Sequence, residues 1–186
     1  ISDLIRQDAK IDSFGVGENL ITSKSDAVLG GVYKMVGIEE NGTIRPLIKV
    51  SESLEKITNP GYKRLYRIYD RESDKAIADY IALYDEILPT DSLYLFDEMQ
   101  PWKEKTVTNY YIKELQVPIF VNGKLVYEIP TQQDVKDYCA RELDSMWDEV
   151  KRLVNPHNYY VDLSPKLYEL KHKLIKQHTG ITKEKE

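Results

Sequence analysis

Two kinds of spacing between hydrophobic residues divide this chain of 186 residues. Near the N-terminus, Ile1, Leu4, Ile5 and Ala9 lie close to one face of a predicted helix over residues 1–10, and Asp8 near its end tolerates a left-handed turn. The apolar run at residues 11–14 predicts a strand. From residue 32 the pattern is that of paired strands, at residues 32–40, 43–50, 62–69 and 76–84, with an Asn41-Gly42 hairpin turn joining the first two.

Residues 85–117 show no clear period. Pro89 and Pro101 interrupt any long element, and the aromatic residues here indicate packed irregular structure, within which residues 106–112 have the composition of a strand. A second Asn-Gly pair, Asn122-Gly123, predicts a hairpin within residues 117–129.

Two helices are predicted to finish the chain. Thr131 and Asp134 resemble a capping box, and Asn155-Pro156 stops the helix that follows. Its apolar positions are Val135, Tyr138, Cys139, Met146, Trp147, Val150, Leu153 and Val154. Ser164-Pro165 is an N-cap with a first-turn proline, and predicts a helix that ends at Gly180 and is followed by a disordered tail at residues 182–186. The inward residues of this last helix are Leu167, Leu170, Leu174 and Ile175.

Composition narrows the class of protein. A net charge of −5 and a pI near 5.4 argue against a nucleic-acid binder, whose surface would be basic. The single cysteine excludes a disulfide framework and a thiolate zinc cluster, and Cys139 on the apolar stripe is expected to be a small buried hydrophobe. No apolar run reaches the length of a membrane span, no signal peptide opens the chain, and a first residue other than methionine indicates a piece of a longer protein.

Residue types that carry catalysis are scattered. His157 is expected to be structural, and His172 and His178 are expected on a solvated helix face. The pairs Asp85-Glu86 and Asp97-Glu98, and the strand residues Arg64 and Arg67, are expected to be solvated charge. The chain contains no Ser/His/Asp order, no paired-histidine metal spacing and no Walker motif, so neither a catalytic residue nor a metal site is predicted.

The stretch with the most chemical content is Phe14-Gly15-Val16-Gly17-Glu18-Asn19-Leu20. Glycine lets backbone N–H groups approach a ligand closely, and several such groups at the mouth of a strand form a concave anion site. From the spacing alone, an ordinary tight turn is the more frequent meaning of G-x-G.

A resemblance favours the anion site. Ile11-Asp12-Ser13-Phe14-Gly15-Val16-Gly17, followed by Leu29-Gly30-Gly31-Val32-Tyr33-Lys34, resembles the nicotinate phosphoribosyltransferase family, whose signature is I-D-x-F-G-V-G-T and then a V-Y-K strand. Lys49-Val50-Ser51 through Lys56-Ile57-Thr58-Asn59-Pro60-Gly61 resembles the family's K-x-S…K-x-T-x-P-G segment. Asn155-Pro156-His157 with Val161-Asp162-Leu163-Ser164 resembles its C-terminal signature.

The resemblance implies an α+β fragment. Residues 1–31 would hold the last strand and phosphate loop of a type II phosphoribosyltransferase α/β barrel, residues 32–130 a β-rich region with hairpins, and residues 131–186 the C-terminal helices and tail. The order helix, strand, glycine loop also suits a barrel whose ligands collect at the C-terminal ends of its strands. The implied whole enzyme makes nicotinate mononucleotide and pyrophosphate from nicotinate and phosphoribosyl pyrophosphate, with ATP hydrolysis coupled through a phosphohistidine, in NAD biosynthesis.

By the same resemblance, the backbone of Gly15, Val16, Gly17, Glu18 and Asn19 holds a 5′-phosphate, and Lys34 at the V-Y-K position adds positive charge, with Lys24 as a second cation. Glu18 stands where the family has threonine, and its carboxylate repels phosphate unless it points away or pairs with a cation. The phosphorylated histidine and the groups that grip nicotinate precede the glycine loop in the family. ATP and Mg²⁺ are implied cofactors of the whole enzyme, and Mg²⁺ would be held mainly by the diphosphate.

Two other interpretations stay open. A nicotinamide phosphoribosyltransferase shares the F-G-x-G loop, although the V-G step and the K-x-T-x-P-G segment favour the nicotinate enzyme. A non-catalytic assembly or interaction domain is the other, because a strand at residues 11–14 would lack neighbours within this chain. The expected partners are the missing N-terminal part of the enzyme and a second copy in a homodimer, in the cytoplasm, with neither nucleic acid nor membrane.

Overall fold

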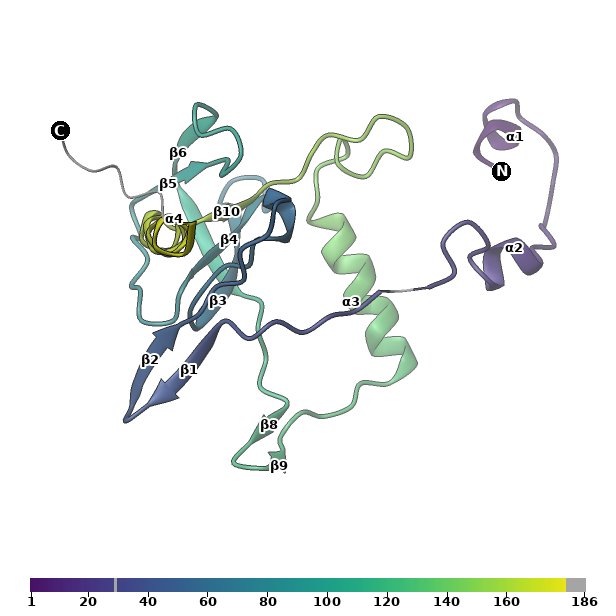
Figure 1. The fold of residues 1–186 in the computed structure, drawn as a ribbon. Helices are drawn as coiled ribbons and strands as arrows, with labels where there is room; N and C mark the ends of the chain where they lie inside the picture. Colours follow the sequence, from purple (N-terminus) through teal and green to yellow (C-terminus); the bar gives the residue numbers. More distant parts are fainter. Residues whose placement is uncertain (29, 180–186) are drawn as a thin grey trace. The chain divides into compact units, whose positions relative to one another are not determined.

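The computed structural model describes residues 1–28 and 30–179 (Figure 1). Contacts divide the chain into two units, Ile1–Tyr33 and Lys34–Glu186, and each is described by itself. The elements are a mixture of helices and small, mostly antiparallel sheets, so the predicted α+β class is confirmed.

The first unit contains two short helices, α1 (Ser2–Arg6) and α2 (Glu18–Ile21). α1 ends before Asp8, whose φ of 56° confirms the left-handed turn. The predicted strand at residues 11–14 is not formed, since this segment pairs with no strand among the described residues. A run of apolar residues specifies a strand only where a neighbour accepts and donates the ladder hydrogen bonds, and here Ile11 and Phe14 are exposed instead.

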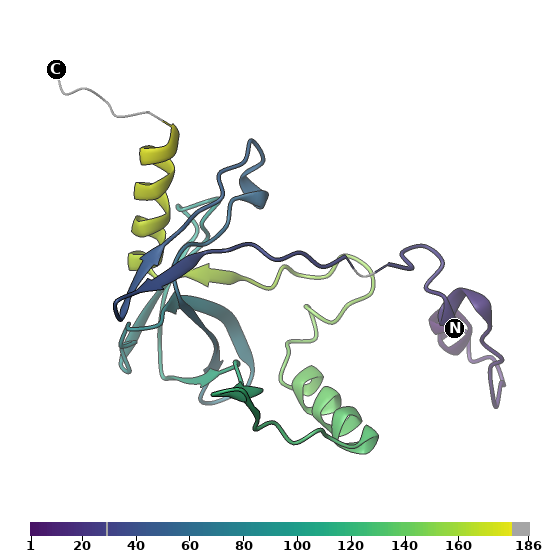
Figure 2. The same ribbon diagram turned by 60° about the horizontal axis from the view of Figure 1, so that its bottom comes forward.

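The second unit is built on a four-stranded sheet in the order β10-β4-β3-β7. β3 (Lys63–Asp70) and β4 (Ala76–Leu83) form the predicted antiparallel hairpin. β7 (Tyr110–Glu114) pairs antiparallel with β3, and β10 (Val161–Leu163) joins the other edge parallel to β4. Figure 2 shows helix α4 (Pro165–Thr179), which directly follows β10, beside this sheet.

Both Asn-Gly hairpins are confirmed. β1 (Gly37–Glu40) pairs with β2 (Thr43–Pro46), and β8 (Phe120–Val121) pairs with β9 (Lys124–Leu125). In each turn the asparagine and the glycine both have positive φ, as a type I′ turn requires. The strands are shorter than predicted because pairing extends only a few residues from each turn.

Residues 85–117 are more regular than predicted. β5 (Ser92–Phe96) and β6 (Glu104–Thr108) pair antiparallel, and Asn109, with φ of 54°, separates β6 from β7 where a single strand over residues 106–112 was predicted. Leu93, Leu95 and Val107 from this hairpin are buried against the four-stranded sheet. A short 3-10 helix, η1 (Leu54–Lys56), precedes the turn that leads into β3.

The core lies between one face of the four-stranded sheet and the β5–β6 hairpin. Small residues on β4 leave room for larger ones on the facing strands, so the layers interdigitate. Tyr110 is almost fully buried, and its hydroxyl donates to the carbonyl of Pro89, so the polar end of the ring keeps a partner. The buried cluster consists of Tyr66, Ile68, Ala78, Tyr80, Ala82, Leu93, Leu95, Val107 and Tyr110.

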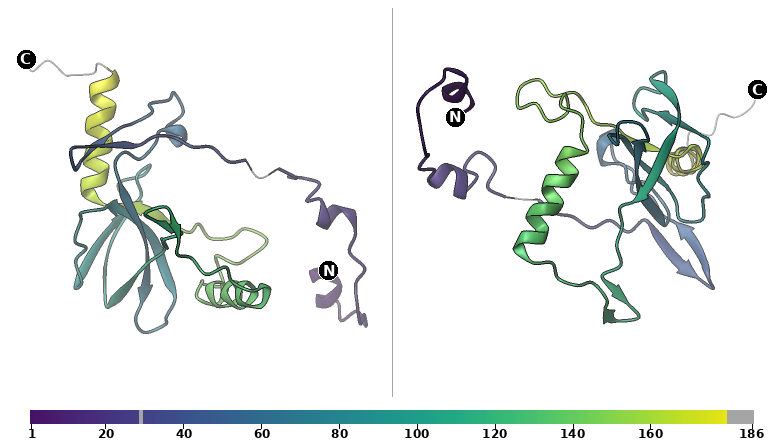
Figure 3. Two further views of the ribbon diagram at one scale, coloured as in Figure 1. Left: turned by 90° about the horizontal axis from the view of Figure 1, so that it is seen from below. Right: turned by 180° about the vertical axis from the view of Figure 1, so that it is seen from behind.

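Helix α3 (Gln132–Asp144) begins at the predicted capping box of Thr131 and Asp134. It ends earlier than predicted, and none of its residues is buried, so the expected burial of Cys139 is wrong. The helical period of the apolar residues identifies an apolar face but does not say what covers it. The path of the chain from the β8–β9 hairpin into this helix is visible in Figure 3.

Helix α4 begins as predicted, because the Ser164 hydroxyl accepts a hydrogen bond from the N–H of Leu167 at 3.1 Å. Leu167 is fully buried, and Leu170, Leu174 and Ile175 are partly buried, which confirms the inward face. Its predicted end at Gly180 and the predicted tail at residues 182–186 lie outside the described residues.

Gly61 gives a test of this packing. Its φ is +82°, and a Cβ added there would lie 3.1 Å from Cδ2 of Leu83, whereas Gly42 has φ of +75° and open space. We expect Gly42→Ala to cost about 1 kcal/mol of unfolding free energy through the left-handed backbone alone. Gly61→Ala should cost about 2 kcal/mol, because Leu83 must also move. Urea denaturation of both variants measures the difference, and equal losses would contradict the packing at Gly61.

Candidate functional site

The glycine loop presents its backbone to solvent. Gly15, Val16, Gly17, Glu18 and Asn19 are all exposed, and their N–H groups donate no hydrogen bond to any described residue. Gly17 is the N-cap of α2, and its carbonyl accepts from the N–H groups of Leu20 and Ile21. One turn therefore brings the five predicted phosphate-binding residues together, with several donors available to a ligand.

The glycines of this loop are not required by the loop's own geometry. Neither Gly15 nor Gly17 has a positive φ, and a Cβ added at either would meet no atom within 4 Å. Lys34, the predicted cation, is exposed and is the first residue of the other unit. Leu29, which precedes it in the quoted segment, lies outside the described residues.

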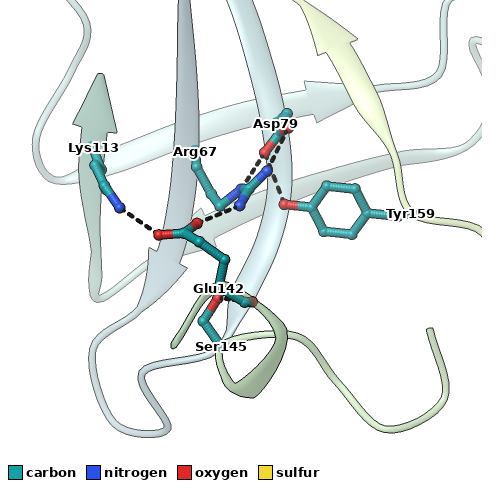
Figure 4. A network of polar contacts seen from close by, with 6 residues as sticks. All are labelled: Arg67, Asp79, Lys113, Glu142, Ser145 and Tyr159. Atoms are coloured by element: carbon teal, nitrogen blue, oxygen red, sulfur yellow. Dashed lines mark hydrogen bonds and ion pairs between the residues drawn. The ribbon is translucent and has the colours of Figure 1, made fainter. Parts of the chain in front are cut away.

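A second polar centre, which the sequence did not predict, is built around Arg67 on β3 (Figure 4). Its Nε donates to Oδ1 of Asp79 at 2.7 Å and its Nη2 to Oδ2 at 3.1 Å, so the two groups form a bidentate pair across β3 and β4. Its Nη1 donates to Oε2 of Glu142 on α3 at 2.9 Å. The Tyr159 hydroxyl donates to the same Asp79 oxygen that accepts from Nε, at 2.9 Å.

Glu142 also resolves a conflict in the sheet. Arg67 on β3 lies directly opposite Lys113 on β7, and like charges in that position repel. The carboxylate of Glu142 accepts from Arg67 with one oxygen and from the Lys113 ammonium, at 2.8 Å, with the other. Two cations and two carboxylates are thereby balanced in a half-buried cluster, the Arg67 network, made of Arg67, Asp79, Lys113, Glu142 and Tyr159.

The titration behaviour of this network follows from its contacts. The hydrogen bond to Asp79 raises the pKa of Arg67 above its already high ordinary value. The hydrogen bond to Glu142 raises the pKa of Lys113, and burial together with the Asp79 charge raises the pKa of Tyr159. All three shifts keep the groups in their usual protonation states, which fits a structural clamp rather than proton transfer.

The network anchors the end of α3. Beyond the Glu142 contact, the Lys75 ammonium donates to the Asp144 carbonyl, and the Ala76 N–H donates to the Ser145 carbonyl at 2.8 Å. A cation at a helix C-terminus satisfies carbonyls that have no partner within the helix. Four hydrogen bonds therefore hold the end of α3 to β3, to β7, to the first residue of β4 and to Lys75 just before it.

The prediction that Arg67 is solvated is wrong, because its side chain is only 14% exposed. Arg64, on the opposite face of β3, is more exposed: it pairs with Glu114 at 3.4 Å and lies 4.2 Å from the ring centroid of Tyr84. The sequence contains an indication of this buried pair. Asp79 interrupts the otherwise apolar strand at residues 76–83. A carboxylate at the centre of such a strand needs a buried partner.

The acidic pairs were also predicted as solvated, and each contributes a structural contact. Glu86 accepts from the Leu83 N–H and from the Ser164 hydroxyl, at 2.7 and 2.6 Å, and so ties the start of α4 to the end of β4. Glu98 forms an ion pair at 2.6 Å with Lys171, which is 5% exposed. His172 is half-buried rather than solvated, and burial lowers its pKa. His178 is exposed, as predicted.

A cleft of about 840 Å³ lies beside the first residues of β4. Its walls come from β4, the β5–β6 hairpin and the segment from Trp147 to Tyr160, and His157 lies on its lining. Asp162 on β10 is 5% exposed and contributes to the lining. Burial and the nearby Asp97 charge raise the pKa of Asp162 to about 6.

The described part of the chain lacks two features. No group of three or more His, Cys, Asp or Glu side chains there could hold a metal ion. Nor does that part contain a helix with both the length and the apolar character needed to cross a membrane.

Comparison with known proteins gives a consistent result. The family model of the nicotinate phosphoribosyltransferase C-terminal domain matches residues 62–171. The nicotinate phosphoribosyltransferase of Bacillus subtilis (strain 168) is 42% identical over 165 residues, which cover 88% of this chain and 34% of that protein. The enzyme of the same name from Dictyostelium discoideum is 31% identical over 183 residues, which cover 92% of this chain and 30% of that protein.

A solved structure agrees in fold. The crystal structure of human nicotinic acid phosphoribosyltransferase matches 80% of this chain and 27% of its own length, with a TM-score of 0.63 and 24% identity. This chain thus spans about a third of the length of the curated relatives that it matches.

The Arg67 network predicts the effect of neutralising Glu142. In Glu142→Gln, Arg67 and Lys113 face each other across the ladder with no carboxylate between them, and we expect a loss of about 2 kcal/mol of unfolding free energy. Glu114→Gln, which removes the exposed partner of Arg64 from the same sheet, is the matched control and should change stability much less. Chemical denaturation of both variants is the measurement, and similar effects would argue against the bridging role of Glu142.

Asp162 predicts a dependence of stability on pH. Its folded pKa, about 6, is above the ordinary value of 3.8, so the fold favours the protonated form. The stability that this group contributes is complete below about pH 4 and is lost as the pH rises through 6. Asp162→Asn, which cannot ionise, should gain about 2 kcal/mol at neutral pH and lose that part of the pH dependence. Denaturation at several pH values tests this, and an unchanged profile in the variant would contradict the assignment.

Proposed function

The chain belongs to the nicotinate phosphoribosyltransferase family, and on that premise we propose that the whole protein containing it joins nicotinate to phosphoribosyl pyrophosphate. The pyridine nitrogen of nicotinate forms a bond to the anomeric carbon of the ribose while the bond to pyrophosphate breaks. The products are nicotinate mononucleotide and pyrophosphate, and the reaction is a step of NAD biosynthesis.

The observation that carries this proposal is the match over residues 62–171. Every member of the Arg67 network falls within that range, as does the buried core beneath it. The match therefore coincides with the residues that determine the fold of the second unit. The relatives named above are described as nicotinate enzymes, which favours nicotinate over nicotinamide as the substrate.

In this proposal the glycine loop holds the 5′-phosphate of phosphoribosyl pyrophosphate and of the product. The backbone N–H groups of Gly15, Val16, Gly17, Glu18 and Asn19 donate to the phosphate oxygens, and Lys34 supplies positive charge. Support comes from the exposed backbone donors and from the open space at both glycines. The loop would act by positioning the ribose and by stabilising negative charge, without taking part in proton transfer.

ATP and Mg²⁺ are proposed as cofactors of the whole enzyme only. The described residues offer no cluster suited to a metal ion, so no step is assigned to a metal held by this chain. Mg²⁺ would arrive on the diphosphate of the substrate. The histidine that couples ATP hydrolysis, and the groups that bind nicotinate, are proposed to lie outside these residues, so that the chain alone is inactive.

The remaining proposals concern assembly. Ile1, Leu4 and Ile5 of the first unit are exposed, as are Val135 and Tyr138 on α3. Exposed apolar residues grouped on a helix favour association with other protein surfaces. We propose that the rest of the enzyme and a second copy in a homodimer use such surfaces, in the cytoplasm.

Gly17→Val tests the role of the loop. Because a Cβ at Gly17 meets no protein atom within 4 Å, the variant should fold normally, with an unchanged melting temperature. We expect it to bind nicotinate mononucleotide at least about tenfold more weakly in the full-length protein, since the side chain blocks the approach of phosphate. Calorimetric titration gives the affinity. Nicotinate, which has no phosphate, is the control ligand and should bind both proteins equally, whereas unchanged affinity for the mononucleotide would rule out the loop as the phosphate site.

A further inference from the structure

No contact within the fold explains why Asp162 is buried. Its side chain is 5% exposed, yet it forms no hydrogen bond and no ion pair with any described residue. A carboxylate that is largely buried and has no hydrogen-bond donor is costly, because the little solvent it still contacts replaces only part of its hydration. The nearest charged influence is repulsive, since Asp97 lies on the same cleft.

Asp79, one register position away, is a carboxylate whose hydrogen bonds are satisfied, and it serves as a comparison. Val161 pairs with Asp79 and Asp162 pairs with Tyr80, so the two acids lie at successive levels of the β10–β4 pair. Asp79 accepts from two nitrogens of Arg67 and from the hydroxyl of Tyr159. Asp162, equally buried in the same sheet, accepts from none. The missing donor is therefore specific to the Asp162 side of the sheet.

The cleft at which Asp162 lies has the size and walls of a ligand site. Its volume of about 840 Å³ is in the range of small-molecule pockets. Phe96, Trp147 and Tyr160 contribute aromatic side chains to its lining. Aromatic faces next to carboxylates attract organic cations by two additive effects, the ring quadrupole and the opposite charge.

The charges around the cleft favour a cation at Asp162. Glu149 pairs with Arg152 at 3.7 Å, whereas Asp97, Glu104 and Asp162 form no ion pair with a described residue. Glu104 accepts from the Tyr94 hydroxyl and Asp97 from the N–H groups of Met99 and Gln100, so Asp162 is the one of these three without a donor among the described residues. The cleft lysines form no ion pair with Asp97 or Asp162. Besides Asp162, the charged or ionisable groups of the lining from each element are Asp97, Lys103, Glu104, Lys105, Glu149 and His157.

We propose that this cleft binds a small organic cation, an amidine, guanidine or amine on a flat apolar body, whose N–H groups donate to the carboxylate of Asp162. The cation supplies the donor that Asp162 lacks and offsets the repulsion from Asp97. The flat body stacks against the aromatic side chains of the lining. The site lies wholly within residues 76–162 and does not rest on the proposed transferase activity.

Benzamidine is the probe, with benzamide, its neutral counterpart of nearly the same shape, as the matched ligand. Titration calorimetry of the full-length protein at about pH 7.5 should show benzamidine binding at least about tenfold more tightly than benzamide. At about pH 5 the preference should shrink, because Asp162 becomes protonated.

Asp162→Asn is the decisive variant. It should lose the preference for benzamidine and the pH dependence together, and because it is expected to be more stable than the parent, the loss cannot be ascribed to unfolding. Asp148→Asn, which removes a carboxylate from an exposed residue outside the cleft lining, is the control and should bind benzamidine as the parent does. A pH dependence of benzamidine binding that persists in Asp162→Asn would come from another group of the lining and would overturn the proposal.

A second readout follows the carboxyl itself. In carbon NMR, the Asp162 carboxyl resonance should titrate with a lower midpoint when benzamidine is present, because a bound cation favours the charged form. Equal binding of benzamide, unchanged affinity in Asp162→Asn, or no binding by the parent would each overturn the proposal. None of these outcomes bears on the binding of nicotinate mononucleotide, so the two proposals fail separately.

Discussion

The outer face of the four-stranded sheet depends on the guanidinium of Arg67. It binds Asp79 on the neighbouring strand with two nitrogens and Glu142 on α3 with the third, so one side chain links β3, β4 and a helix 75 residues further along the chain. A buried ion pair is weak evidence for net stability, because desolvation offsets much of the attraction. Its clearer effect is on geometry. An arginine that stays charged needs its carboxylates at fixed positions, and this requirement specifies where α3 ends against the sheet.

The contacts between the end of α3 and the sheet also position one wall of the cleft. The chain leaves α3 at Ser145, whose carbonyl accepts from Ala76, and returns to the sheet at Tyr159, whose hydroxyl reaches Asp79. The segment between these two attachments supplies Trp147 and Tyr160 to the cleft wall. The wall is therefore held at both ends by contacts to one strand, β4. Asp162 follows directly, and its lack of a donor contrasts with Asp79 because every donor of the Arg67 network faces the other side of the sheet.

The features that the sequence predicts correctly depend on residues close together in the chain. Each Asn-Gly turn, the Thr131–Asp134 capping box and the Ser164-Pro165 helix start depend on residues within a few positions of one another, and each is confirmed. What it missed depends on partners far along the chain. The sequence predicts Arg67 and Glu98 to be solvated because their partners, Glu142 and Lys171, lie more than 70 positions away. The predicted apolar face of α3 is wrong in two respects. The helix ends at Asp144, before Met146 and the later predicted positions, and none of its residues is buried by the described part of the chain.

Two features of the first unit, an unpaired segment and a pair of glycines, have no explanation in the contacts of that unit. The segment at residues 11–14 has strand-like composition but no strand to pair with, and Gly15 and Gly17 occupy positions where neither a positive φ nor a crowded Cβ calls for glycine. Gly61 shows the contrast, since both its φ and its contact with Leu83 exclude a side chain. Glycine at an unconstrained position costs folding free energy through the entropy of the unfolded chain, with no gain inside the unit. That cost is offset if the loop binds the phosphate proposed above, since its exposed N–H groups can donate to an anion.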